Sequence, residues 1–136
     1  MRVVIAGILA GLGMAFVMGI GERLGLAKIY LPMIDGRFFF KDRLSNTVTY
    51  LVGLLIHMVT SITFAVGYII FKLIVPIPMS NITSGIVWAF ILWVAFGLTV
   101  SPVTGYGLFG SKAGQRTWLE LLFTHLVFGL ILCFLV

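Results

Sequence analysis

The chain has 136 residues, of which 61% are hydrophobic and only 10% are charged. A soluble domain carries about 25% charged residues, so this chain has too few charges to cover a surface that faces water. Its mean hydropathy of +1.20 indicates a protein whose solvent is the lipid bilayer.

Four uninterrupted apolar segments are long enough to cross the hydrocarbon core, which takes about 20 residues of helix. Because these runs lack an alternation of apolar and polar residues, we expect helices rather than membrane strands. The predicted fold is an all-α membrane protein, a four-transmembrane-helix bundle that forms one domain over residues 1–136. The predicted helices cover residues 3–20, 48–71, 82–100 and 117–136.

The first segment places its smallest residues on one helical face. Helices in lipid associate by close contact rather than by expulsion of water, and small side chains let two backbones approach. We therefore expect a groove for another helix, either of the same chain or of another subunit. Its residues, at every fourth position, are Gly7, Gly11, Ala15 and Gly19. Gly85 in the third segment and Gly129 in the fourth are expected to serve the same kind of packing.

Residues 21–47 mix aromatic, aliphatic and basic side chains. Such a segment is expected to rest in the membrane interface, with rings at headgroup depth and charges in water. A docking surface for a partner protein is the alternative interpretation. The interfacial or partner-binding residues are predicted to be Arg37, Phe38, Phe39, Phe40, Lys41 and Arg43.

Two histidines lie within the apolar segments, His57 in the second and His125 in the fourth. Both are about ten residues into their segments, so at 1.5 Å per residue they reach similar depth. Two level histidines could be the axial ligands of a haem b, with Gly53 and Gly129 making room for the ring. The alternatives are hydrogen bonds to neighbouring helices and a quinone, metal or proton site. Two histidines are too few for a closed metal site.

The two halves of the chain resemble each other. AGI at residues 6–8 echoes SGI at residues 84–86, and LLIHMV at residues 54–59 resembles LLFTHLV at residues 121–127. A duplicated helical hairpin would keep its orientation and would give a pseudo-twofold axis along the membrane normal. Two repeated helical hairpins are therefore one form that the predicted bundle could take.

The connection before the fourth segment contains a formal G-x-G-x-x-G at Gly105, Gly107 and Gly110. This motif binds nucleotides only between a strand and a helix, and here a membrane helix precedes it. We therefore predict a turn-rich connector. Glu120 follows Arg116 by four residues, a helical spacing that predicts an ion pair.

The basic residues are distributed unequally between the connections. Seven lie in residues 21–47 and 101–116, and only Arg2 and Lys72 lie on the opposite side. The positive-inside rule then places both of these loops in the cytoplasm and both termini outside. We expect no nucleic-acid binding, because these cations are spread over loops beside a membrane without a binding module.

The stretch GLFGSKAGQRTWLELLFTHLVFG at residues 107–129 resembles small four-helix bacterial inner-membrane proteins of unknown function, the YagU-like group. That group shares a glycine-rich first helix, a histidine in the second and a glycine-rich loop before the fourth. The matching residues here are Gly7, Gly11, His57, Gly107, Gly110, His125 and Gly129. The basic, phenylalanine-rich part of residues 21–47 departs from the group. The resemblance implies a fold and a prokaryotic cytoplasmic (inner) membrane location, but no activity.

These observations predict a non-catalytic accessory subunit that packs against a larger respiratory, photosynthetic or other redox complex. Its expected partners are membrane lipids and other membrane-protein subunits, with no catalytic residues, no metal and no cofactor. One alternative is an electron-transfer subunit that holds haem b between His57 and His125. Another is a small stand-alone transporter or a stress-response membrane protein.

Overall fold

The computed structural model describes residues 1–40, 43, 45–75 and 78–136, and these are helical without strands. Four helices are long and apolar enough to cross a membrane, which confirms the predicted all-α bundle. The ends of these helices lie within three residues of the predicted bounds. They are α1 (Arg2–Arg23), α3 (Asn46–Ile74), α4 (Asn81–Leu98) and α6 (Thr117–Leu135). The chain is therefore a multi-pass membrane protein.

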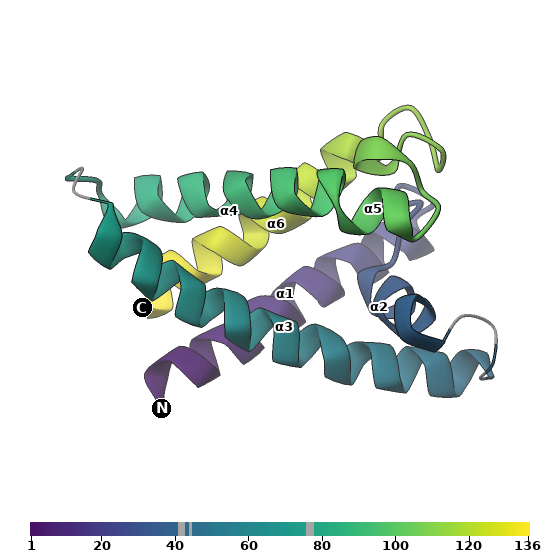
Figure 1. Ribbon diagram of the computed structural model, residues 1–136, viewed down its shortest axis with the longest axis horizontal. Coiled ribbons are helices and arrows are strands. Elements are labelled where there is room, and N and C mark those ends of the chain that lie inside the picture. Colours follow the sequence, from purple (N-terminus) through teal and green to yellow (C-terminus); the bar gives the residue numbers. More distant parts are fainter. Residues whose placement is uncertain (41–42, 44, 76–77) are drawn as a thin grey trace.

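The four long helices do not form a closed bundle in which each helix packs against both of its neighbours. α1 packs against both α3 and α6, and α4 packs against α6. α3 and α4 follow each other in the chain, yet they contact each other little and diverge (Figure 1). Both termini lie at one end of the bundle. The short helices α2 (Leu31–Phe40), α5 (Val100–Val103) and η1 (Leu108–Gly110) lie at the other end (Figure 1).

Small residues occupy the closest helix contacts. A Cβ on Gly7 would lie 2.7 Å from the Ile62 Cα, and one on Gly11 would lie 2.4 Å from the Ser61 Oγ. The groove on α1 therefore receives α3 of the same chain. Gly19 lies outside this contact, because the nearest atom to its Cβ position is a Tyr30 ring carbon at 3.8 Å. Ala15 is buried.

Gly85 and Gly129 meet where α4 crosses α6. A Cβ on Gly85 would lie 2.6 Å from the Gly129 carbonyl oxygen, and one on Gly129 would lie 2.3 Å from the Gly85 carbonyl oxygen. Each glycine thus accepts the backbone of the other, which is the close approach that packing in lipid requires.

Residues 21–47 form more than an interfacial loop, because they contain the ten-residue helix α2. α2 buries Leu31, Ile34 and Gly36 and packs along α3. The reason is a backbone contact, since a Cβ on Gly53 would lie 1.7 Å from the Pro32 carbonyl oxygen. Pro32 is tolerated in the first turn, where its missing N–H has no helical partner.

The connector before α6 is rich in turns. Gly105, Gly107 and Gly110 all have positive φ angles, which L residues with side chains rarely adopt. The Ser101 hydroxyl donates to the Gly107 carbonyl at 2.6 Å and accepts from the Gly110 N–H at 2.8 Å. These glycines therefore form the turns of the connector, and the hydroxyl of the buried Ser101 holds the turns together.

The predicted repeat pairs α1 with α3 and α4 with α6, and the helices of each pair are in contact. A twofold axis relating the pairs would make α3 contact α4 as fully as α1 contacts α6. The α1–α6 contact is extensive and the α3–α4 contact is sparse. The packing departs from twofold symmetry at this place, and the departure leaves space between α3 and α4.

We expect Gly129→Ala to lower the thermal stability of the purified protein, because its methyl group would overlap the Gly85 carbonyl. Overpacking of this kind typically costs about 1–3 kcal/mol. Gly19→Ala is the matched control, since its methyl group meets only an ordinary contact. Equal melting temperatures for the two variants in the same detergent would contradict the crossing.

Candidate functional site

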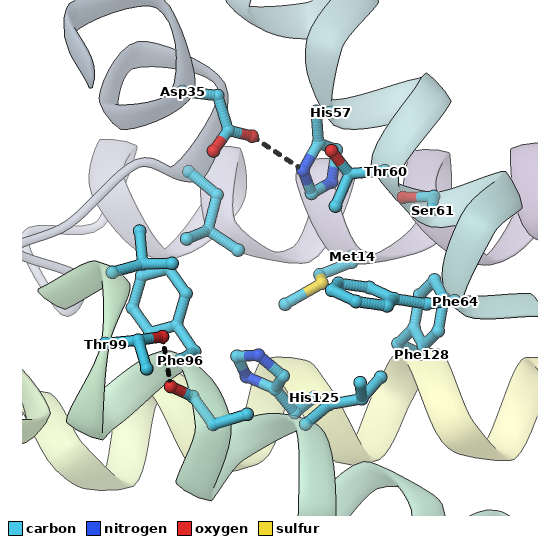
Figure 2. Close-up of a pocket in the computed structure, with 14 residues that line it drawn as sticks. Met14, Asp35, His57, Thr60, Ser61, Phe64, Phe96, Thr99, His125 and Phe128 are labelled. Carbon is cyan, nitrogen blue, oxygen red and sulfur yellow. Dashed lines mark hydrogen bonds and ion pairs between the residues drawn. The ribbon is translucent and has the colours of Figure 1, made fainter. Parts of the chain in front are cut away.

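A cavity of about 130 Å³ lies between α3 and α4, with α1 and α6 behind it and α2 at one end. Its walls are mostly apolar, including Met14 from α1 and Phe128 from α6. Both histidines line it, His57 from α3 and His125 from α6 (Figure 2). We call this cavity the imidazole pocket. It lies where α3 and α4 diverge instead of packing against each other.

His57 is held by a carboxylate that reaches it from α2. The Asp35 Oδ2 lies 3.2 Å from the His57 Nδ1 (Figure 2). His57 is 6% exposed, and the Asp35 side chain is 20% exposed. We infer that the Nδ1 of His57 carries the proton, because carboxylate oxygens accept hydrogen bonds. Its Nε2 is buried and, within the described part of the chain, has no hydrogen-bond partner.

His125 is fixed through the same ring nitrogen. Its Nδ1 lies 2.6 Å from the carbonyl oxygen of Leu121, one turn earlier on α6. A carbonyl cannot donate, so Nδ1 again carries the proton, and in the neutral ring Nε2 keeps its lone pair. The ring is 5% exposed and lies against Phe96, with ring centroids 5.6 Å apart.

The two imidazoles therefore have the same chemical arrangement. Each has its Nδ1–H engaged by an oxygen of the protein, and each neutral ring has an unprotonated Nε2. Proteins fix the tautomer and orientation of a ligand-binding histidine by a hydrogen bond from the ring nitrogen that does not bind the ligand to an oxygen of the protein. Such an Nε2 can accept a hydrogen bond, take up a proton or coordinate a metal. Among the residues that the structure describes, no group of three His, Cys, Asp or Glu side chains could hold a metal ion.

The pocket opens between α3 and α4. Its lining includes three exposed residues, Phe64 on α3, Ala95 on α4 and Thr99 at the end of α4. The histidines lie behind them, buried. In a membrane the region beside two spanning helices is lipid, so the opening is accessible to molecules dissolved in the bilayer.

The space around the histidines differs from what haem binding led us to expect. The space beside each glycine that was predicted to make room for the ring is occupied. The backbone of α2 lies against Gly53, and Gly85 lies against Gly129. The cavity of about 130 Å³ is also smaller than the roughly 300–1,000 Å³ of pockets for drug-sized ligands. A haem would require α3 and α4 to separate further. The haem b assignment stays a prediction.

The predicted interfacial residues lie away from the imidazole pocket. Arg37, Phe38, Phe39 and Phe40 form the exposed second half of α2, and Arg43 is exposed after it. Lys41 lies outside the described residues.

Glu120 does not form the predicted ion pair. The ion pair that the structure shows in the described ranges is His57 with Asp35. The Glu120 carboxylate instead accepts a hydrogen bond from the Lys28 backbone N–H at 2.8 Å. It therefore fastens the segment between α1 and α2 to α6.

Asp35 is the site residue that the sequence reasoning missed. The signal was present in the pattern LPMIDG at residues 31–36, in which Leu31, Ile34 and Gly36 are buried. A carboxylate between buried neighbours enters the bundle with them. Comparisons of the chain with protein-family models, with curated proteins and with solved structures found no match, so the resemblance to the YagU-like group stays a prediction.

We predict that both histidines carry their proton on Nδ1 when neutral. The ¹⁵N chemical shifts of the ring nitrogens, measured at alkaline pH on protein labelled at histidine, distinguish the two tautomers. Asp35→Leu should change the spectrum of His57 and leave that of His125 in place, because Leu121 holds the latter. An Nε2–H tautomer at either position in the unmodified chain would contradict the arrangement.

Proposed function

We propose that this chain is a small membrane protein that binds a lipid-soluble molecule carrying a hydroxyl donor, of the hydroquinone class, in the imidazole pocket. The observation that carries the proposal is the pair of histidines whose Nδ1–H groups are both engaged by the protein. The complementary group on a ligand is a hydrogen-bond donor. The proposed role is binding rather than chemical turnover.

The buried Nε2 of His57 provides a driving force for such binding. A buried polar atom without a partner costs about 1–3 kcal/mol, and a ligand hydroxyl would remove that cost. The walls suit an aromatic ring, because Phe64, Phe96 and Phe128 line the pocket together with the thioether of Met14. The opening between α3 and α4 gives access from the bilayer.

Binding of an alkylated hydroquinone to the detergent-purified protein tests the proposal. We expect it to raise the melting temperature, as any ligand of the folded state does, and its dimethyl ether to raise it less. His125→Leu should reduce this difference, since it removes one of the two acceptors and one hydrogen bond contributes about 0.5–1.5 kcal/mol, or up to about tenfold in affinity. This variant leaves no buried charge unpaired, because the partner of His125 is a helix carbonyl.

A pair of tryptophan substitutions tests the opening in the same assay. Ala95→Trp should block the mouth, whereas Ile91→Trp places the same ring one turn away on an exposed residue of α4 that does not line the pocket. Equal stabilisation by the hydroquinone and its ether, or unchanged binding to Ala95→Trp, would rule out the proposed site.

An accessory subunit of a larger membrane complex remains a second proposal. Its support is the exposed run at the end of α2, where Phe38 and Phe39 pack edge to face with ring centroids 5.0 Å apart, beside the exposed Arg37. We propose that the end of the bundle carrying most of the basic residues faces the cytoplasm, by the positive-inside rule. A prokaryotic inner membrane is proposed on the resemblance alone.

Isolation in a mild detergent tests this second proposal. We expect other membrane proteins to accompany the chain and Phe39→Ser to release them, whereas a chain that always migrates alone would contradict a subunit role. The visible spectrum of the same preparation tests the haem alternative. A haem band lost in both His57→Ala and His125→Ala would replace the hydroquinone proposal with an electron-transfer role.

A further inference from the structure

A second cavity, of about 520 Å³, lies at the basic end of the bundle and shares no lining residue with the imidazole pocket. It is bounded by the last turns of α1, the segment that leads into α2, α2 itself and the start of α3, with one residue from the connector before α6. We call it the basic pocket. Six of its lining residues are cations or phenols: Arg23, Lys28, Arg37, Tyr30, Tyr50 and Tyr106.

The charges around the basic pocket are unbalanced. Three cationic side chains line it against one carboxylate, that of Glu22, which leaves three minus one, or two, positive charges. None of the three cations forms an ion pair with a residue in the described ranges. Three cations that share one carboxylate repel one another, and an anion in the cavity would relieve that repulsion.

The phenols supply neutral donors beside these cations. The Tyr30 hydroxyl donates to the Tyr50 hydroxyl at 3.3 Å, and the two rings stack with centroids 5.8 Å apart. Burial, with smaller contributions from Tyr50 and Glu22, raises the pKa of Tyr30, so its hydroxyl stays protonated at neutral pH. Tyr50 accepts from Tyr30 and lines the pocket, so its own O–H can donate to a ligand there.

We propose that the basic pocket binds the phosphate group of an anionic phospholipid. Guanidinium groups bind phosphate oxygens in a bidentate manner, and Lys28 and the tyrosine hydroxyls add single donors. Basic pockets between helices at the membrane surface hold lipid headgroups in this way. Leu24 and Leu26, each 67% exposed, lie in the same connecting segment as Lys28 and provide apolar surface for the rest of a lipid.

Native mass spectrometry of the full chain tests this site. The protein would be released from micelles of phosphatidylcholine that contain phosphatidylglycerol, and we expect one phosphatidylglycerol to stay bound in preference to phosphatidylcholine. The double variant Arg23→Gln/Arg37→Gln should retain it about tenfold less, because each basic residue contributes several-fold to the affinity for an anionic lipid. Lys112→Gln, an exposed cation of the same basic end outside the pocket, is the matched control.

Tyr50→Phe gives an independent reading, because it removes one hydroxyl and no charge. Weaker retention in this variant and in the arginine pair, but not in Lys112→Gln, supports the site. Equal loss in Lys112→Gln, or no preference over phosphatidylcholine, would overturn it. Inorganic phosphate separates the two sources of the group. If it protects the protein against thermal unfolding through the same arginines while phosphatidylglycerol does not bind, the ligand is a soluble phosphate and the lipid assignment is wrong.

Discussion

Direct contact between helix backbones is the constraint on which this structure depends. Apolar side chains gain little from meeting one another when the surroundings are also apolar, so close approach must hold the helices together. Gly85 and Gly129 provide it between α4 and α6, and Gly7 provides it between α1 and α3, where Gly11 makes room for the Ser61 side chain. Among the described residues no glycine brings the backbones of α3 and α4 together, and these two helices diverge. The imidazole pocket lies in the space between them.

Polar groups in the bilayer interior need partners from within the protein, and the partner of His57 comes from an unexpected element. α2 is too short to span the membrane, yet its backbone lies against Gly53 of α3. That contact delivers Asp35 to the buried ring. The same glycine thus positions a helix and, through it, decides which nitrogen of His57 carries the proton.

The sequence was sufficient for the parts of the fold that depend on length and apolar character. The four spans follow from uninterrupted apolar runs. His57 and His125, which the residue count predicts at similar depth, line one pocket. The connector glycines could be assigned to turns because a helix precedes them. Each of these inferences uses only local information.

The sequence was insufficient where a helix has several apolar faces of similar composition, any of which could pack against another helix. In lipid, an apolar face gives no sign of whether it meets a helix or the bilayer, so the divergence of α3 and α4 could not be anticipated. For the same reason, Gly53 was predicted to make room for a haem ring, whereas the backbone of α2 lies against it. A glycine in a helix does not indicate which group packs against it. Asp35 was overlooked because its helix lies within a stretch whose composition resembles an interfacial loop.

The position of α2 has a thermodynamic consequence. Leu31 and Asp35 line the imidazole pocket, whereas Met33 and Arg37 line the basic pocket, so ten residues form a wall common to both. An occupant that shifts this wall from one side alters the affinity on the other side. Linkage makes the effect reciprocal, with the same coupling free energy in both directions. If both proposed sites are occupied, this shared partition would couple the lipid at the rim of the bundle to the ligand at its centre.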